Sequence, residues 1–221
     1  MGSGARPLSW IVMRRTTALR DIFGRSQMST SLKNCVTNEA AVEYVARLNP
    51  TLVAIDGLPC SGKSTLAEKL RSPLGASWVS LDEFVLPERH WPRTMAPAFP
   101  FEYIRYDAFV TAVRSLVTAG ECSFNPFDWS TYEIADEPRT VKCNVPVIVE
   151  GVSALHPDLA PLFDVRIFVE SNRSTALQAA LDRGVGPWES QWRELFLPSA
   201  DLYIATEPQK RADLLVAGRG I

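Results

Sequence analysis

The sequence predicts an α/β fold in which helices cover a mostly parallel five-stranded sheet, and two observations support this prediction. The first is a series of short, unbroken apolar runs, which are typical of strands buried on both faces of a parallel sheet. The second is that segments with helical spacing of apolar residues separate these runs, as in layered α/β proteins. With 221 residues, 46% of them hydrophobic and 22% charged, the chain suffices for one domain with a core of ordinary size.

Five apolar runs are the predicted strands, and the first three of them end at an acidic residue. The first run ends at Asp56, the second at Asp82 and the third at Glu150. In open α/β sheets, ligands bind beyond the carboxyl ends of the strands. These three carboxylates therefore mark the edge of the sheet where a site is expected. The runs cover residues 51–55, 78–81, 145–150, 165–169 and 212–217.

Helical spacing of apolar residues predicts the elements between the strands. The first predicted helix starts at Asn38, which can cap it, and the third is stopped by Gly120. Pro198 is expected to interrupt the last one. Two segments rich in aromatic residues, 86–101 and 123–140, are predicted to be irregular loops. The helices are expected at residues 38–48, 63–71, 105–119, 174–182 and 189–205.

Residues 1–34 are interpreted as a poorly ordered basic N-terminal extension, and residues 35–221 as the folded domain. The extension is rich in Arg and Ser and contains a single acid, Asp21. Its apolar stretch at 10–13 is shorter than the about 7–15 residues of a secretory signal. Two alternatives stay open: an organelle transit peptide, or an overlong start in which Met28 is the first residue.

Composition excludes several classes of protein. The net charge of -2 shows no basic excess of the kind that long nucleic acids attract. The longest apolar runs fall far short of the roughly 20 residues that a membrane-spanning helix needs. The 4 cysteines are scattered without metal-ligand or C-x-x-C spacing, as expected of reduced thiols. We therefore expect a cytoplasmic protein without nucleic-acid or membrane partners.

The turn after the first predicted strand carries a phosphate-binding pattern. Residues 57–64, Gly-Leu-Pro-Cys-Ser-Gly-Lys-Ser, match G-x-x-x-x-G-K-[ST] between an apolar run and a helical pattern. Glycines allow the sharp turn that points backbone N–H groups at phosphate oxygens, and the following helix adds the positive end of its dipole. The pattern predicts the three-layer P-loop NTPase fold. The residues expected to bind ATP are Gly57, Pro59, Cys60, Ser61, Gly62, Lys63, Ser64 and Thr65.

The reaction expected of this site is phosphoryl transfer to a small molecule. The chain lacks the N-K-x-D motif of GTPase switches and is short for a motor or AAA-type ATPase. Lys63 is predicted to act in catalysis by reaching the β- and γ-phosphates, while Ser64 and Glu150 would hold Mg²⁺. Asp82 is the predicted catalytic base for the acceptor hydroxyl, with a helix N-cap as its alternative role. Asp56 is expected to stabilise the loop.

With these residues considered, the chain resembles the uridine kinase family of P-loop kinases, which includes phosphoribulokinase and bacterial pantothenate kinase. The match covers about residues 51–217 and rests on four segments: 55–65, 79–84 with its strand-end Asp and following aromatic, Phe127-Asp128-Trp129, and 147–152. Residues 184–192 and 211–216 look like those of a compact actinobacterial branch. The resemblance implies a kinase that uses ATP and Mg²⁺, with Phe127-Asp128-Trp129 lining the acceptor site.

One segment departs from the family pattern. The family's lid helix carries several arginines and ends in Arg-Asp, whereas residues 177–183 hold one arginine in the reversed order Asp182-Arg183. Arg173 and Arg183 are the candidates to reach the transferring phosphoryl group, and a solvated helix face is their alternative place. The sparse lid leaves a second function open, that of a nucleotide-binding regulatory module without turnover.

Aromatic and charged residues gather in the two loops that flank the predicted helix at 105–119. A small planar or ribose-bearing acceptor could stack on the aromatic rings and hydrogen-bond to the polar side chains. The alternative for each aromatic residue is a place in the core under the loops. The predicted substrate-binding residues are Asp82, Phe84, His90, Arg105, Tyr106, Phe127, Asp128, Trp129 and Glu150.

These patterns together predict a kinase that moves the γ-phosphate of ATP to a hydroxyl of a small metabolite. A nucleoside is the first choice of acceptor, with its 5′-hydroxyl as the nucleophile. Pantothenate, a sugar or another vitamin precursor remain alternative acceptors. Assembly into a homo-oligomer also stays open.

Overall fold

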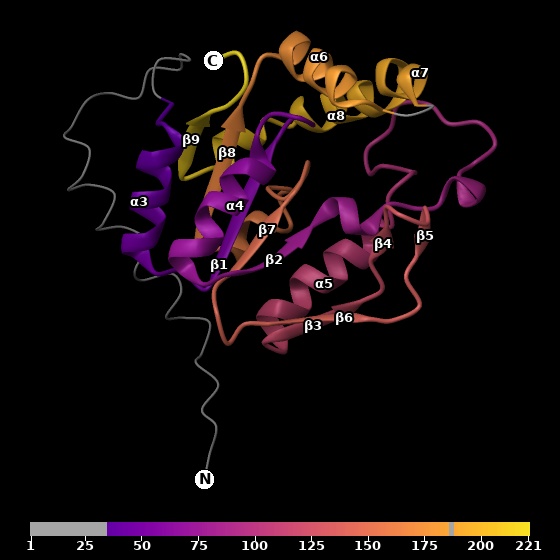
Figure 1. Ribbon diagram of the computed structural model, residues 1–221. Coiled ribbons are helices and arrows are strands. Elements are labelled where there is room, and N and C mark those ends of the chain that lie inside the picture. Colours follow the sequence, from indigo (N-terminus) through magenta and orange to yellow (C-terminus); the bar gives the residue numbers. More distant parts are fainter. Residues whose placement is uncertain (1–34, 186–187) are drawn as a thin grey trace. The chain divides into compact units, whose positions relative to one another are not determined.

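The computed structural model describes residues 35–185 and 188–221, which belong to the unit Asn34–Ile221 (Figure 1). The predicted basic extension at 1–34 lies outside the described residues. None of the described helices is long and apolar enough to cross a membrane. All four cysteines are free thiols.

A five-stranded sheet of parallel strands forms the centre of this unit, in the order β2-β7-β1-β8-β9. The sequence-based prediction of an α/β fold with a mostly parallel five-stranded sheet is confirmed. β1 lies in the middle, and all 6 of its residues are buried, as its continuous apolar run predicted. The strands are β1 (Leu52–Gly57), β2 (Ser77–Ser80), β7 (Val147–Glu150), β8 (Val165–Glu170) and β9 (Leu214–Ala217).

The register of the sheet brings the predicted acidic strand ends to one level. Glu150 in β7 is paired with Ile55 in β1 on one side and with Ser80 in β2 on the other. Asp56 and Leu81 directly follow these two partners in the sequence. The loops after the three strands therefore open at the same edge of the sheet.

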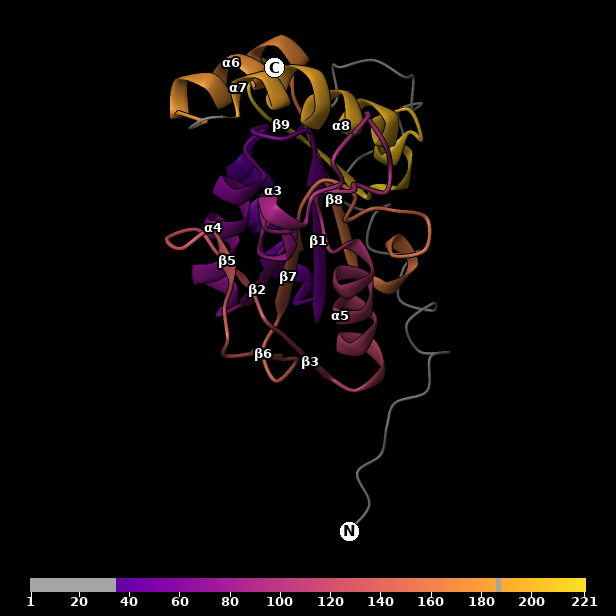
Figure 2. The same cartoon turned by 90° about the vertical axis from the view of Figure 1, so that its right-hand side faces the viewer.

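Helices cover both faces of the sheet, which gives the three layers predicted from the sequence (Figure 2). Val53 and Ile55 of β1 pack with α3 (Asn38–Leu48) and α4 (Lys63–Leu74) on one face. Ala54 points to the opposite face, where α5 (Tyr106–Thr118) packs. These alternating side chains make one apolar core on each side of the sheet.

Two helix ends differ from the sequence-based predictions. Thr37, rather than Asn38, is the N-cap of α3, because its hydroxyl accepts the backbone N–H of Ala40. α4 extends beyond the predicted end at residue 71 to Leu74, and it contains Pro73 in its last turn. Gly75 then ends the helix in the left-handed conformation that suits glycine.

The segment predicted to be a loop at 123–140 instead contains short antiparallel strands. β3 (Glu121–Phe124) pairs with β6 (Arg139–Lys142), and β4 (Phe127–Asp128) pairs with β5 (Glu133–Ile134). Residues of β3 alternate between exposed and buried positions, as in a strand with one solvated face. Strands of 2 to 4 residues give too little periodicity to be recognised from the sequence alone.

The C-terminal helices lie beyond the carboxyl ends of the strands (Figure 1). Pro198 does not break the last predicted helix, because a π-helical turn precedes it and α8 continues through it. A wider turn accommodates a residue that lacks an N–H and crowds the carbonyl four residues earlier. The elements are α6 (Arg173–Arg183), α7 (Glu189–Gln191), the π-helical turn (Trp192–Phe196) and α8 (Leu197–Ile204).

Candidate active site

The predicted phosphate-binding loop lies between β1 and α4, and its backbone conformation requires glycine at two positions. Gly57 has a φ of 147°, and a Cβ atom there would lie 2.5 Å from the carbonyl oxygen of Val169 in β8. Gly62, which precedes α4, has a φ of 111°. The sharp turn therefore delivers the chain directly into the N-terminus of a helix, where anions bind favourably.

Lys63 is the first residue of α4, and its side chain folds back over the loop. Its ammonium donates a hydrogen bond of 2.7 Å to the carbonyl oxygen of Leu58, and the residue is only 7% exposed. The positive charge is thus held where the loop would surround phosphate groups. A triphosphate in the loop would offer this ammonium anionic oxygens, which make stronger hydrogen bonds than a neutral carbonyl.

Glu150 lies at the end of β7, buried between two serine hydroxyls. Its Oε1 accepts hydrogen bonds from Ser80 at 2.7 Å and from Ser64 at 3.4 Å. Burial raises the pKa of Glu150, the charge of Lys63 opposes the rise, and the charge of Asp82 adds to it. A carboxylate beside a serine hydroxyl fits Mg²⁺, which prefers oxygen ligands and uses few protein side chains when it also binds phosphates. Ser64 and Glu150 are therefore the residues that would hold the ion.

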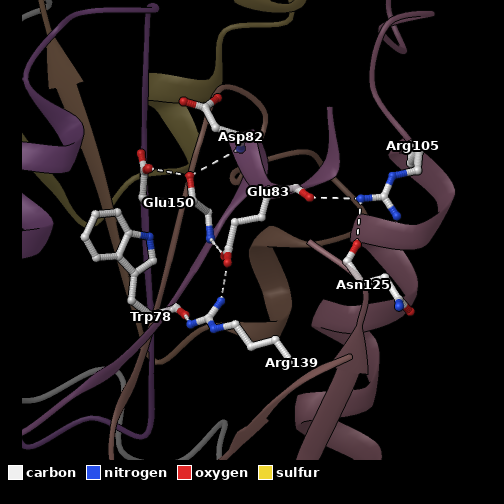
Figure 3. Close-up of polar contacts among 8 residues, drawn as sticks. Trp78, Asp82, Glu83, Arg105, Asn125, Arg139 and Glu150 are labelled. Carbon is white, nitrogen blue, oxygen red and sulfur yellow. Dashed lines mark hydrogen bonds and ion pairs between the residues drawn. The ribbon is translucent and has the colours of Figure 1, made fainter. Parts of the chain in front are cut away.

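Asp82 lies in a short 3₁₀ turn, Leu81–Phe84, that follows β2 (Figure 3). The N-cap of this turn is Ser80, whose hydroxyl accepts the backbone N–H of Asp82 at 3.2 Å. The alternative role of Asp82 as an N-cap is therefore filled by another residue. The Asp82 carboxylate is exposed and lines the cavity described below.

Asp56 occupies the position beneath the loop, where it accepts hydrogen bonds from three separate elements. Its Oδ1 accepts from the backbone N–H groups of Gly57 at 2.6 Å and Ser153 at 3.1 Å. Its Oδ2 accepts from the Leu155 N–H at 2.8 Å and from the Tyr203 hydroxyl of α8 at 2.5 Å. Complete burial raises the pKa of Asp56, and these hydrogen bonds counteract the rise. The carboxylate stabilises the loop, as expected from the sequence.

A cavity of about 380 Å³ opens at this edge of the sheet and joins two chemically different ends. At one end lie residues of the phosphate-binding loop, and Asp82 and Glu150 also line the cavity. The other end is mostly aromatic. Its rings come from the loop after β2, the β4–β5 turn and the C-terminal helices. They belong to Trp91, Phe101, Tyr103, Trp129, Tyr132, Trp188, Trp192 and Phe196.

The structure brings more than half of the predicted site residues into this cavity. Arg183 of α6 lies beside the loop, where its guanidinium donates to the sulfur of Cys60 at 3.3 Å. Gly57 and Ser61 support the loop from behind rather than line the cavity, and Ser61 is fully buried. The predicted residues that line it are Pro59, Cys60, Gly62, Lys63, Ser64, Thr65, Asp82, Trp129, Glu150 and Arg183.

Three predicted substrate-binding residues are part of the scaffold instead. The Phe84 ring is fully buried and packs against Phe109 and Phe124 in the core. The Arg105 guanidinium donates to the carbonyl oxygens of Glu83 and Asn125 at 2.9 and 2.8 Å (Figure 3). Tyr106 is buried in the same core, where desolvation raises its pKa to about 12. Buried backbone carbonyl oxygens need hydrogen-bond donors, and this need explains why the Arg105 side chain turns inward.

The other predicted residues that the structure does not bring to the cavity lie at its margin or further away. His90 is exposed on a 3₁₀ turn, and Phe127 is buried behind Trp129. Asp128 accepts hydrogen bonds from the hydroxyl and N–H of Ser130, and these bonds lower its pKa. Arg173 forms an ion pair with Asp201 of α8 at 2.7 Å.

Sequence reasoning missed several cavity residues, and one of them carried a recognisable signal. Arg219 lines the cavity from the loop after β9, and its backbone N–H donates to the Ser61 carbonyl at 3.1 Å. The same carboxyl-end argument that selected Asp82 applies to this loop. Trp188, Trp192 and Phe196 gave no such signal, because only the tertiary packing of the C-terminal helices brings them to the cavity.

Comparison with known proteins gives matches in both sequence and structure, although no family model matches the chain. The chain is 27% identical over 184 residues to the uridine kinase of Mycoplasma pneumoniae, which covers 75% of this chain and 84% of that protein. It is 26% identical over 183 residues to uridine-cytidine kinase A of Dictyostelium discoideum, covering 76% of this chain. In that second protein the match spans only 36% of the length.

Solved structures agree with this sequence similarity. A proposed uridine kinase from Bacillus stearothermophilus superposes with a TM-score of 0.61 at 20% identity, over 80% of this chain and 98% of that one. Phosphoribulokinase from Rhodobacter spheroides gives a TM-score of 0.53 at 12% identity, over 76% of this chain and 70% of that one. The fold is that of the α/β P-loop NTPases, and the class is that of kinases acting on small molecules. Within this class, the chain is similar in sequence to uridine kinases.

Proposed function

We propose that this kinase transfers the γ-phosphate of ATP, with Mg²⁺, to a hydroxyl of a small acceptor, for which a nucleoside is the first choice. The observation that carries the proposal is that Lys63, Glu150 and Asp82 line one cavity together with a group of aromatic rings. The uridine kinases of Mycoplasma and other organisms, which the chain resembles, support a nucleoside as acceptor.

The chemistry of the step follows from the residues around the cavity. Lys63 binds and orients the phosphates, and Arg183 is placed to stabilise charge on the transferring group. The acceptor oxygen forms a bond to the γ-phosphorus while the bond from that phosphorus to the β,γ-bridging oxygen breaks, and ADP leaves. Asp82 accepts the proton of the hydroxyl. Mg²⁺ held by Ser64 and Glu150 would neutralise phosphate charge when bound.

The test is acceptor-stimulated ADP release with ATP, Mg²⁺ and uridine. We expect Asp82→Asn to lower kcat by about 10²-fold or more while leaving ATP affinity unchanged, since only the base is lost. Asp136→Asn, which alters an exposed carboxylate that does not line the cavity, is the matched control. Equal turnover of the wild type and Asp82→Asn would show that the base lies elsewhere.

A nucleotide-binding module without turnover remains a second candidate function, because one observation favours it. Of the two arginines predicted for the lid, Arg173 is held by Asp201, while Arg183 lies at the cavity. For such a module we expect tight ATP binding, and no acceptor should stimulate ADP release. Release stimulated by uridine would reject it.

A further inference from the structure

The turn that carries Asp82 is held by side chains on either side of it. The turn Leu81–Phe84 has 4 residues, and Ser80 precedes it as the N-cap of a capping box. The Ser80 hydroxyl accepts the N–H of Asp82 at 3.2 Å, while the Glu83 carboxylate reaches back to the N–H of Ser80 at 2.9 Å (Figure 3). These bonds satisfy N–H groups that a single helical turn leaves without partners. Glu83 thus fixes the backbone that presents Asp82 to the cavity.

The Ser80 hydroxyl also connects this turn to the candidate magnesium ligand. Besides accepting the N–H of Asp82, it donates a hydrogen bond of 2.7 Å to Oε1 of Glu150. Both Ser80 and Glu150 are buried, so water competes little for this bond. One hydroxyl therefore orients the Glu150 carboxylate and the backbone of Asp82 together, and a displacement of Ser80 would move both.

Arg139 joins the turn to the two-stranded sheet of β3 and β6. Its guanidinium forms an ion pair with Glu83 at 2.5 Å and donates a second hydrogen bond to the carbonyl oxygen of Trp78 in β2 (Figure 3). It also lies over the ring of Phe124, 5.6 Å from the centroid. Arginine suits this place because its rigid fork serves two acceptors while its face stacks on a ring. The side chains of Arg139 and Glu83 are 36% and 22% exposed, so water screens their charges less than at an open surface.

We propose that Glu83 and Arg139 are positioning residues for phosphoryl transfer, acting through Ser80. Through this serine they set where the carboxylates of Asp82 and Glu150 lie. The inference rests on the proposed function and adds to it two residues that do not line the cavity. A small misplacement of a reacting group can lower a rate by about 10²-fold. Loss of a partner of a metal ligand typically lowers metal affinity or activity by about 10–100-fold.

Calorimetry with a non-hydrolysable ATP analogue tests the proposal without turnover. Each protein is titrated once with Mg²⁺ and once with EDTA, and the gain in affinity that Mg²⁺ gives is compared. In EDTA, Arg139→Gln and Glu83→Gln should bind the analogue like the wild type, because the phosphate-binding loop is unchanged. With Mg²⁺ they should bind it about tenfold more weakly than the wild type, since Ser80 no longer holds Glu150 in one orientation.

ADP release with ATP, Mg²⁺ and uridine gives the second measurement. Arg139→Gln should lower kcat by about tenfold or more, because Asp82 is no longer held toward the acceptor. The same change is then made in the Asp82→Asn variant. There its effect on kcat should be several-fold smaller, since the base that Arg139 helps to position is already absent. A merely structural role would lower kcat equally in both backgrounds.

The matched controls lie in the same two-stranded sheet. Lys142 of β6 forms an ion pair with Glu121 of β3 at 3.4 Å, and both residues are exposed. Lys142→Gln and Glu121→Gln remove the same kinds of charge without altering the turn, so both should match the wild type in each measurement. Arg139→Lys is the second variant, for use if Arg139→Gln does not fold. It keeps the charge but not the fork, so its losses should be smaller than those of Arg139→Gln.

The outcomes separate this proposal from the kinase function. Wild-type kcat and wild-type affinity with Mg²⁺ in Arg139→Gln would overturn the positioning role, while the kinase function stands. Equal weakening in EDTA and Mg²⁺, or an equal loss of kcat with and without Asp82, would also overturn it. If the wild type shows no turnover but the variants lose the gain from Mg²⁺, the kinase function fails and the positioning of Glu150 stands. If the wild type neither releases ADP nor gains affinity from Mg²⁺, both proposals fail.

Discussion

The two ends of the cavity are built in different ways. The nucleotide end comes from consecutive residues, 57–65, whose backbone conformation and helix start create the site. The acceptor end is assembled from three separate segments, around Trp91, Trp129 and Trp188, which only tertiary packing brings together. The first end is therefore encoded locally, while the second depends on how loops and C-terminal helices pack.

Lys63→Ala should have the largest effect and should damage the nucleotide end alone. Removing the ammonium takes away the main positive charge held over the loop, so turnover should fall by about 10³-fold or more. ADP release with ATP, Mg²⁺ and uridine measures the loss. Because the aromatic end of the cavity is separate from Lys63, calorimetry without nucleotide should give the same uridine affinity as in the wild type.

The matched control for this variant is Lys69→Ala in the same helix. Lys69 is exposed and pairs with Glu39 rather than with the loop, so its loss should leave turnover unchanged. Lys69→Ala should keep the melting temperature within a few degrees of the wild type, since an exposed ion pair contributes at most about 1 kcal/mol. Undiminished turnover in Lys63→Ala would contradict the assignment of this lysine to the phosphates.

The same contrast explains how much the sequence could predict. The strands, their acidic ends and the loop from Gly57 to Thr65 were all predictable, because apolar runs and a contiguous motif specify them. Phe84 and Tyr106 were placed in the acceptor site from their position next to conspicuous motifs, yet both pack in the core. Composition near a site cannot tell which face of an aromatic-rich loop turns inward, since that depends on partners distant in sequence.

The short strands β3 to β6 and the cavity residue Trp188 show the same limit. Neither has a local pattern long enough to decide between a loop and an ordered element. Arg219 is different, because the rule that ligands bind at strand carboxyl ends would have found it after β9. Extending that rule to every strand of the sheet, rather than to the acidic ends alone, would have completed the nucleotide end.

Tyr203→Phe tests a buried hydrogen bond between α8 and the strand end beneath the phosphate-binding loop. Tyr203 belongs to α8, next to the C-terminal rings, and donates to Asp56 beneath the loop. Losing a hydrogen bond to a charged group should lower the free energy of unfolding by about 1.5–3 kcal/mol. Urea denaturation at pH 8 measures the change. Tyr44→Phe, which removes a phenol hydroxyl in α3 on the other face of the sheet, should cost less.

The loss in Tyr203→Phe should also depend on pH. Burial places the pKa of Asp56 above its ordinary value of 3.8, and the Tyr203 hydrogen bond holds it lower than burial alone would. Removing that bond raises the pKa of Asp56 further, so the variant loses most stability where Asp56 is ionised. As the pH falls through the raised pKa, Asp56 becomes protonated in the folded state and the difference from the wild type shrinks. A difference that grows toward acid pH would contradict this assignment.

Arg105→Ala should have the smallest effect on function, although the sequence placed this residue in the acceptor site. Its guanidinium satisfies the carbonyl oxygens of Glu83 and Asn125 and lies over the Phe84 ring. Its loss leaves those carbonyls without their charged donor, so stability should fall by about 1–3 kcal/mol. The KM for uridine should not change, because the side chain does not line the cavity. Trp188→Ala should give the opposite result, a raised KM with little loss of stability, so the pair separates scaffold from recognition at the acceptor end.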